Sequence, residues 1–167
     1  MKTTYLYTLV SAAAVATVAC GVAAPARAQS PVRWSIAPLV GPLKAGVATT
    51  VHIEASLQPG WHIYSITQPA GGPIATRISL PLEQPFELAG AATPTPVPRV
   101  AFDDAFHMNV ELHEKSVGFA VPVRYTGAAT ARPDSVRVNV RYQVCNASLC
   151  YPPQTAKLAA PVTAHAR

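Results

Sequence analysis

The seventeen prolines of this 167-residue chain constrain its fold more than any other sequence feature. Proline has no backbone N–H to donate to a helical hydrogen bond, and inside a helix its ring clashes with the preceding turn. The prolines are spread over the chain, and no stretch of ten residues shows the 3.6-residue apolar period of an amphipathic helix. We therefore expect a fold without long helices.

Alternation of apolar and polar residues predicts β-strands instead. Residues 50–57 and 117–123 place an apolar side chain at every second position, as half-buried strands do. The same pattern makes residues 135–145 the longest expected strand, with Cys145 on the face that carries the polar side chains. Further strands are expected at residues 32–37, 61–64, 74–80, 86–88, 110–113 and 157–162, whereas residues 91–98, rich in Pro, Thr and Ala, are expected to form a loop.

About eight short strands separated by Pro/Gly turns predict an all-β fold, most simply an immunoglobulin-like antiparallel β-sandwich. The length suits a single domain, which we place at residues 29–167. No internal repeat or second domain is expected.

The first 28 residues have the pattern of a secretory signal peptide. Lys2 is the only charge before a long Ala-rich apolar run at residues 5–24. Ala26 and Ala28 then supply the small residues that signal peptidase recognises, so an exported mature chain is expected to begin at Gln29.

Two alternatives remain for this N-terminal segment. Thr17-Val-Ala-Cys20 weakly resembles a lipobox, which would make the protein a lipoprotein anchored at Cys20. The apolar run is a weak candidate for an uncleaved membrane anchor. No later segment approaches the ~20 apolar residues that a transmembrane helix needs.

The charge of the mature chain indicates neither nucleic-acid binding nor a polybasic membrane patch. Lys2 and Arg27 lie in the signal segment, so eleven basic and eight acidic residues remain, a net charge of +3. The basic residues are scattered and not clustered on one stretch. We expect a monomer that binds no nucleic acid.

Cys145 and Cys150 are the only cysteines of the expected mature chain. Cys145 ends a predicted strand, and Cys150 begins the returning one. Residues that face each other in an antiparallel pair have Cα atoms roughly 4.5–5.5 Å apart, which is within disulfide reach. In an exported protein such a pair is either a structural cross-link or a redox centre.

The position of the pair favours redox chemistry over a structural role. A disulfide that closes so short a loop removes little chain entropy and joins two strands that the hairpin already joins. Exchange requires one sulfur within reach of a partner and a second placed to resolve the mixed disulfide, and the end of a hairpin offers both. Pro152 and Pro153 cannot donate to a β-ladder, so this edge is expected to stay open.

The motif Tyr142-Gln143-x-Cys145-x4-Cys150-Tyr-Pro-Pro-Gln-Thr155 resembles the active-site hairpin of the periplasmic N-terminal domain of DsbD thiol:disulfide reductases. Pro59-Gly60-Trp61-His-Ile-Tyr64 with the Gly71-Gly-Pro73 loop resembles an early strand and turn of that family. Phe102-Asp-Asp-Ala-Phe106-His resembles its cap loop. The similarity spans essentially residues 31–162.

The resemblance implies a role for each residue of the motifs. Cys150 is the attacking sulfur that forms the mixed disulfide, and Cys145 resolves it. Phe106 is the cap aromatic that lies over the pair and swings away for a partner. The other implied site residues are Asp103 and Asp104, which lead into the cap, and Tyr64, an aromatic beside the pair.

The resemblance also implies partners and a compartment. The domain relays electrons in the periplasm without a cofactor, as a component of a protein-disulfide reductase. Its partners are exported thioredoxin-fold proteins, such as disulfide isomerases or cytochrome c maturation factors. Because the sequence ends at Arg167, we expect a separate membrane thiol reductase to be the electron donor.

Two departures from the family pattern accompany the resemblance. The cysteine spacing is one residue shorter than in the best-known members, and Ala105 stands where a further acidic residue occurs in relatives. The alternative function is a non-catalytic exported binding or scaffold module whose disulfide is only structural.

A copper site is a minor alternative use of the same region. His62, His107, Met108 and His113 are ligand types that copper takes, together with Cys145. Their spacing places them on no common face of the predicted strands, so no metal site is expected.

Overall fold

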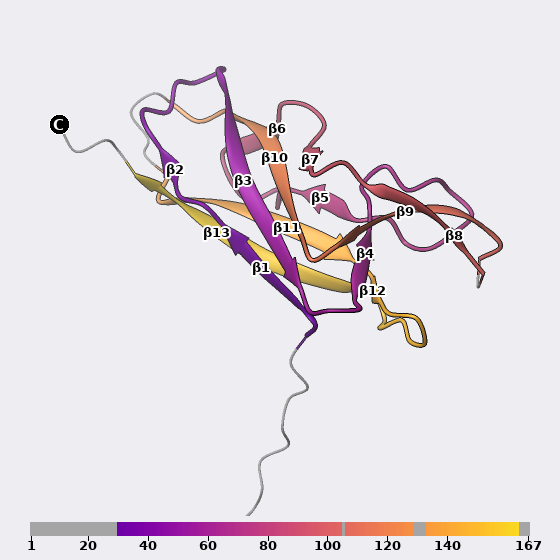
Figure 1. Cartoon of the computed structure of the whole chain (residues 1–167). Helices are drawn as coiled ribbons and strands as arrows, with labels where there is room; N and C mark the ends of the chain where they lie inside the picture. Colours follow the sequence, from indigo (N-terminus) through magenta and orange to yellow (C-terminus); the bar gives the residue numbers. More distant parts are fainter. Residues whose placement is uncertain (1–29, 105, 129–132, 164–167) are drawn as a thin grey trace, which may run out of the picture.

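The computed structural model describes residues 30–104, 106–128 and 133–163. These residues fold into paired β-strands (Figure 1). The predicted signal peptide, Cys20 and Gln29 lie outside these residues. The strands are β1 (Val32–Ile36), β2 (Leu39–Val40), β3 (Ala48–Leu57), β4 (His62–Tyr64), β5 (Arg77–Ser79), β6 (Phe86–Leu88), β7 (Thr93–Thr95), β8 (Arg99–Asp103), β9 (Met108–Glu114), β10 (Ser116–Tyr125), β11 (Ser135–Tyr142), β12 (Val144–Cys145) and β13 (Gln154–Thr163). No helix long and apolar enough to cross a membrane occurs within the described ranges.

Two sheets form the sandwich. The first has the order β1-β3-β10-β6, with β7 also paired to β10, and the second has the order β2-β13-β11-β5. Except for the parallel pair of β2 and β13, their strands pair antiparallel. Alternate residues of β3, β10 and β11 point between the sheets and are almost fully buried, which is the burial that the period of two predicts. This architecture confirms the predicted all-β, immunoglobulin-like antiparallel sandwich.

A third sheet, of order β12-β4-β9-β8, extends from one end of the sandwich (Figure 1). One face of this sheet turns toward the main core through Ile63 and Val144. On the other face a second, smaller cluster gathers Tyr64, Val110, Leu112 and Cys145. The cysteine pair therefore lies at the end of the molecule where this third sheet meets the sandwich.

Three local predictions were wrong. Residues 91–98 contain β7, whose Pro94 faces Phe119 of β10, and an edge strand tolerates a proline because its outer N–H is not needed for pairing. The expected strand 135–145 is interrupted at Gln143, after which β12 leaves β11 and pairs with β4. The edge strand β8 was not predicted.

His113 is a titratable group enclosed in the fold. Its side chain is 3% exposed and meets the ring of Phe119 edge-on at 6.0 Å. Within the described residues its Nε2 has no hydrogen-bond partner. Burial lowers the pKa of His113 below 6.5, although the nearby carboxylate of Glu111 opposes this shift.

Acidification is therefore expected to destabilise the fold through His113. A lowered folded-state pKa means that the unfolded chain binds more protons, so stability is complete above pH 6.5 and falls as the pH decreases toward the folded-state pKa. Urea unfolding between pH 7.5 and 5 measures this slope. In a His113→Leu variant the slope should flatten, whereas replacing the exposed His52 with Gln should leave it unchanged.

Candidate active site around the Cys145–Cys150 disulfide

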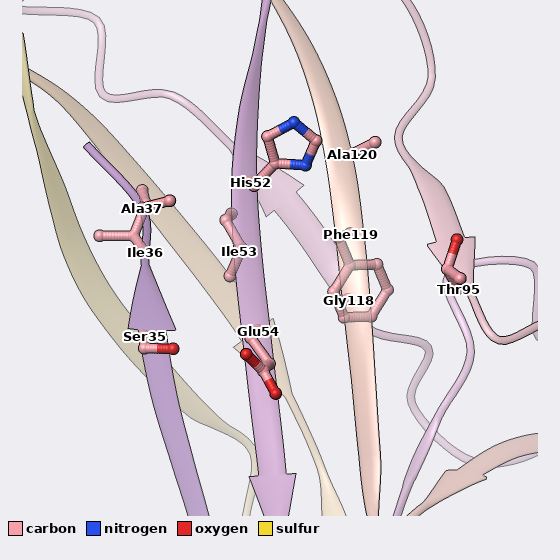
Figure 2. A pocket seen from close by; sticks show the side chains of 10 residues that line it. All are labelled: Ser35, Ile36, Ala37, His52, Ile53, Glu54, Thr95, Gly118, Phe119 and Ala120. Carbon is pink, nitrogen blue, oxygen red and sulfur yellow. The ribbon is translucent and has the colours of Figure 1, made fainter. Parts of the chain in front are cut away.

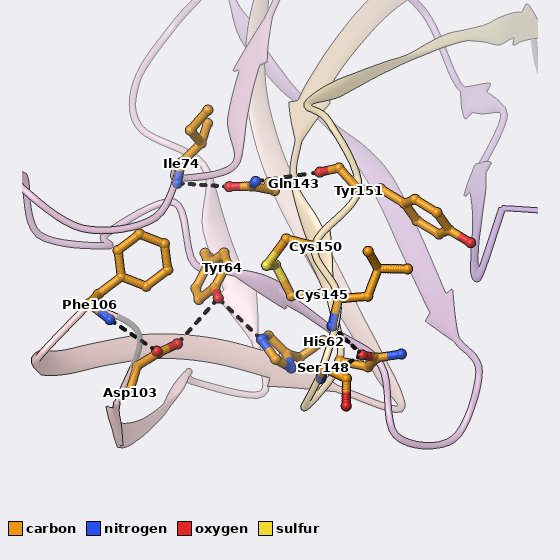
Figure 3. The surroundings of a disulfide bond; sticks show 12 residues. His62, Tyr64, Ile74, Asp103, Phe106, Gln143, Cys145, Ser148, Cys150 and Tyr151 are labelled. Atoms are coloured by element: carbon orange, nitrogen blue, oxygen red, sulfur yellow. Dashed lines mark hydrogen bonds between the residues drawn. A yellow bond between two sulfur atoms is a disulfide. The ribbon is translucent and has the colours of Figure 1, made fainter.

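A disulfide joins Cys145 and Cys150 at the end of the third sheet (Figure 3). Their Cα atoms are 4.1 Å apart, and the two residues form an antiparallel bridge. The cross-strand placement expected from the sequence is thus present. The bonded pair closes a loop of four intervening residues.

The side chain of Asn146 determines the conformation of this loop. Its Oδ1 accepts hydrogen bonds from the backbone N–H groups of Ser148, at 2.9 Å, and Leu149, at 2.8 Å. The backbone N–H of Asn146 donates to the carbonyl of Leu149. An asparagine that mimics a backbone turn in this way makes a tight loop without glycine.

Gln143 and Tyr151 hold the hairpin against its neighbours. Gln143 accepts a hydrogen bond from the backbone N–H of Ile74 and donates one to the carbonyl of Tyr151 (Figure 3). The ring of Tyr151 stacks on Trp61 at 5.3 Å with an interplanar angle of 6°. Tyr151 is therefore tied to Trp61, just before β4, and through Gln143 to the loop before β5.

The two sulfur-bearing residues differ sharply in exposure. Cys145 is 1% exposed and packs with Tyr64, Val110 and Leu112. Cys150 is exposed, and so is its neighbour Leu149, at 49%. The surface therefore exposes the residue at one end of the disulfide and not the residue at the other.

The β8–β9 hairpin carries the residues of the predicted cap. Asp103 ends β8, and its Oδ1 accepts a hydrogen bond from the backbone N–H of Phe106 at 3.3 Å. His107 follows with φ = 51°, a left-handed conformation that histidine adopts more readily than most residues. Asp104 is exposed, and Ala105 lies outside the described residues. Asp103 thus shapes the turn that presents Phe106.

Phe106 is 36% exposed, so it is not an ordinary core residue. In the view of Figure 3, the ring of Tyr64 lies between the Phe106 ring and the disulfide. Tyr64 is itself buried, at 1% exposed. Tyr64, Asp103 and Phe106 thus lie in the surroundings of the disulfide (Figure 3).

A chain of hydrogen bonds joins β4 to the cap. The Tyr64 hydroxyl donates to Asp103 Oδ2 at 3.4 Å and is 3.3 Å from Nε2 of His62. Burial and the Asp103 carboxylate raise the pKa of Tyr64 to about 12, so the hydroxyl keeps its proton. From the sequence, His62 is a candidate only for copper binding. Its spacing of two from Tyr64, which puts both on one face of a strand, was the available signal.

The residues considered for copper do not come together. His62 and His113 point to opposite faces of the third sheet, because His62 pairs with Glu114 while His113 pairs with Ile63. Cys145 is occupied by its disulfide. Within the described residues, no three His, Cys, Asp or Glu side chains form a group that could hold a metal ion.

A concave region lies away from the disulfide. It is a shallow hollow of about 400 Å³ on the outer face of the first sheet (Figure 2). The small residues Gly118 and Ala120 lie between His52 and Glu54 of β3 and Thr95 of β7. The hollow is open and lacks a buried polar group directed into it, among the residues described, so the disulfide region is the better candidate site.

Comparison with known proteins points to one family. The model of the family described as "Thiol:disulfide interchange protein DsbD, N-terminal" matches residues 40–161. The crystal structure of the N-terminal periplasmic domain of ScsB from Proteus mirabilis has a TM-score of 0.52 and 17% identity, covering 78% of this chain and 45% of that one.

A second solved structure is the N-terminal domain of DsbD from Neisseria meningitidis in the reduced form. It has a TM-score of 0.48 and 15% identity, covering 70% of this chain and 80% of that one. The search of curated proteins gave no significant match. The ScsB likeness supports the fold, and the family match covers both cysteines and the residues of the predicted cap.

Proposed function

Because the chain belongs to the family of DsbD N-terminal domains, we propose that it relays electrons by thiol–disulfide exchange through Cys145 and Cys150. The observation that carries this proposal is the unequal exposure of the two cysteines. Cys150 is exposed and Cys145 is 1% exposed, which suits an attacking and a resolving sulfur, respectively.

The exchange takes place in two steps. When the domain accepts electrons, a partner thiolate attacks the Cys150 sulfur and the disulfide breaks. The electron pair stays on Cys145, which then takes up a proton. The partner's second cysteine attacks the mixed disulfide, so the partner is oxidised and both cysteines of the domain are reduced. Delivery to the next protein follows the same steps in reverse.

The expected partners are thioredoxin-fold proteins, whose cysteine pairs carry out this chemistry. A membrane thiol reductase would supply the electrons, and disulfide isomerases or cytochrome c maturation factors would receive them. The ScsB domain is described as periplasmic. The predicted signal peptide would bring this chain to the same compartment, with Asp103, Asp104 and Tyr64 flanking the exchange site.

Electron transfer to a thioredoxin-fold protein tests the function. The mature protein is reduced, freed of reductant and mixed with an oxidised thioredoxin-fold disulfide isomerase, and free thiols in each protein are then counted by mass spectrometry after alkylation. The proposal predicts that two thiols appear in the isomerase for every disulfide formed here. If both proteins keep their initial redox states, the relay function is excluded for that class of partner.

Phe106 is proposed to limit access to the disulfide. A Phe106→Ala variant is expected to be reduced several-fold faster by glutathione, because removing the phenyl ring uncovers Tyr64, which lies between Phe106 and the disulfide in the view of Figure 3. Phe102→Ala is the matched control, since Phe102 is an exposed aromatic four residues earlier, on the face of β8 opposite to Asp103. Equal rates of reduction by glutathione for the Phe106 variant and the native protein would rule out this role of Phe106.

The alternative, a binding module with a purely structural disulfide, makes a different prediction. If the disulfide serves exchange, only the chain entropy of its short loop is at stake. A Cys145→Ala, Cys150→Ala double variant then loses no more than about 2 kcal/mol of unfolding free energy. Urea denaturation measures the loss. A much larger loss, accompanied by no exchange in the native protein, would favour the structural alternative.

A further inference from the structure

His62 occupies the position directly across the ladder from Cys145. In the pairing of β12 with β4, Cys145 is the Cα partner of His62. Side chains at directly opposed positions of an antiparallel pair lie on the same face, with Cβ atoms about 4.5–5.5 Å apart. Tyr64 lies on this face too, two residues along β4, and packs against Cys145. The side chains of His62 and Cys145 therefore leave directly opposed positions on the same face of the third sheet.

The hydrogen bonds of Tyr64 fix the tautomer of neutral His62. The tyrosine hydroxyl has one hydrogen, which it donates to the Asp103 carboxylate. Its contact with His62 must then be a hydrogen bond donated by the Nε2–H group. This leaves Nδ1, the ring nitrogen nearer the strand, with the basic lone pair. Such an arrangement, a base oriented by a third group, is the one that activates nucleophiles in enzymes.

Charged groups surround His62 on its face of the third sheet. Glu114 faces it from β9, and Asp103 and Arg99 face it from β8. Burial lowers the pKa of His62 below 6.5, the two carboxylates oppose this, and Arg99 adds to it. At neutral pH the ring is then mainly neutral and able to accept a proton.

We propose that His62 is the catalytic base that removes the proton from the Cys145 thiol when this sulfur resolves a mixed disulfide. This inference rests on the proposed exchange function. The Cys145 proton moves to Nδ1 of His62, and the sulfur attacks Cys150. The Cys145–Cys150 bond forms, the bond from Cys150 to the partner breaks, and the partner leaves as a thiolate. In the reverse direction the imidazolium returns the proton to departing Cys145.

Oxidised glutathione is the probe for a test by rapid mixing. The reduced protein should react in two phases: formation of the Cys150–glutathione mixed disulfide, with a rate proportional to glutathione concentration, and a concentration-independent resolution by Cys145. General-base catalysis typically contributes 10²–10⁴-fold. A His62→Gln variant keeps a donor toward Tyr64 but has no base, and should slow resolution about a hundredfold at pH 7 with little change in the first phase.

The pH profile separates this role from a structural one. In the native protein the resolution rate should level off once His62 is neutral. In the His62→Gln variant it should keep rising about tenfold per pH unit below the thiol pKa, because only the Cys145 thiolate then reacts. His52→Gln, an exposed histidine on the first sheet, is the matched control and should behave as the native protein.

The outcomes distinguish this inference from the function on which it rests. A native protein that exchanges with thioredoxin-fold proteins, together with an unchanged resolution rate and pH profile in His62→Gln, overturns the role of His62 alone. A native protein that exchanges with no thioredoxin-fold partner overturns the function. If the variant fails to fold, the native profile decides, because a rate that follows thiol ionisation without levelling off contradicts base catalysis.

Discussion

Replacing Cys150 with alanine is expected to abolish exchange with a thioredoxin-fold partner, whereas replacing Cys145 is expected to trap it. Without Cys150, the remaining sulfur is buried at 1% exposure and beyond the reach of another protein. Without Cys145, the exposed Cys150 still forms a mixed disulfide, but no sulfur remains to resolve it. Non-reducing electrophoresis should show a covalent complex with Cys145→Ala and none with Cys150→Ala.

The contrast between the two variants is the informative result. Ser148→Ala is the matched control, because Ser148 lies in the same exposed loop and its bond to Asn146 comes from the backbone N–H, which the variant keeps. This variant should exchange normally. A complex trapped by Cys150→Ala in place of Cys145→Ala would reverse the assigned roles, and trapping by both would mean that the difference in exposure does not govern attack.

Among the variants proposed here, Phe119→Ala is expected to cause the largest loss of unfolding free energy. The Phe119 ring is 1% exposed and packs against Trp34 at 6.2 Å and His113 at 6.0 Å. Truncating a buried phenylalanine typically costs about 3–5 kcal/mol, through lost transfer free energy and the cavity that remains. Domains are stable by only about 5–15 kcal/mol, so much of the native stability would be lost.

The position of Phe119 links this loss to the site. Phe119 belongs to the sandwich, and His113 belongs to the sheet that carries Tyr64 and His62, so the variant should loosen the third sheet as well. Urea unfolding measures the free energy, and glutathione reduction measures access to the disulfide. Leu82→Ala, at a fully exposed side chain, should leave both unchanged. A loss below about 1 kcal/mol for Phe119→Ala would mean that the core closes around the deletion.

The sandwich strands could be predicted because their information is local. Residues 50–57 and 117–123 alternate strictly, and the structure buries the apolar set of each in β3 and β10. The cysteine hairpin was equally local, since a strand end, a short loop and a return are visible in the sequence. Each of these segments is specified by its own periodicity, whichever strand it pairs with.

The edge strands, and the side chains that share a face of the third sheet, could not be predicted because they depend on pairing between distant segments. Residues 99–103 form β8 because β9 lies beside them, and residues 93–95 form β7 only against β10. The break at Gln143 redirects Cys145 from the polar face predicted for it into a buried cluster. The position of His62 opposite Cys145 follows from the register of β4 with β12. The pattern of a single strand does not specify that register.

The reduction potential of the Cys145–Cys150 pair tests the central claim most directly. The mature protein is equilibrated with glutathione or dithiothreitol buffers of graded potential, and the oxidised fraction is counted by alkylation and mass spectrometry. A relay predicts a value in the range of thiol oxidoreductases, about −120 to −270 mV, from which electrons pass readily in either direction. A value well below about −300 mV, typical of structural disulfides in secreted proteins, would contradict the relay function.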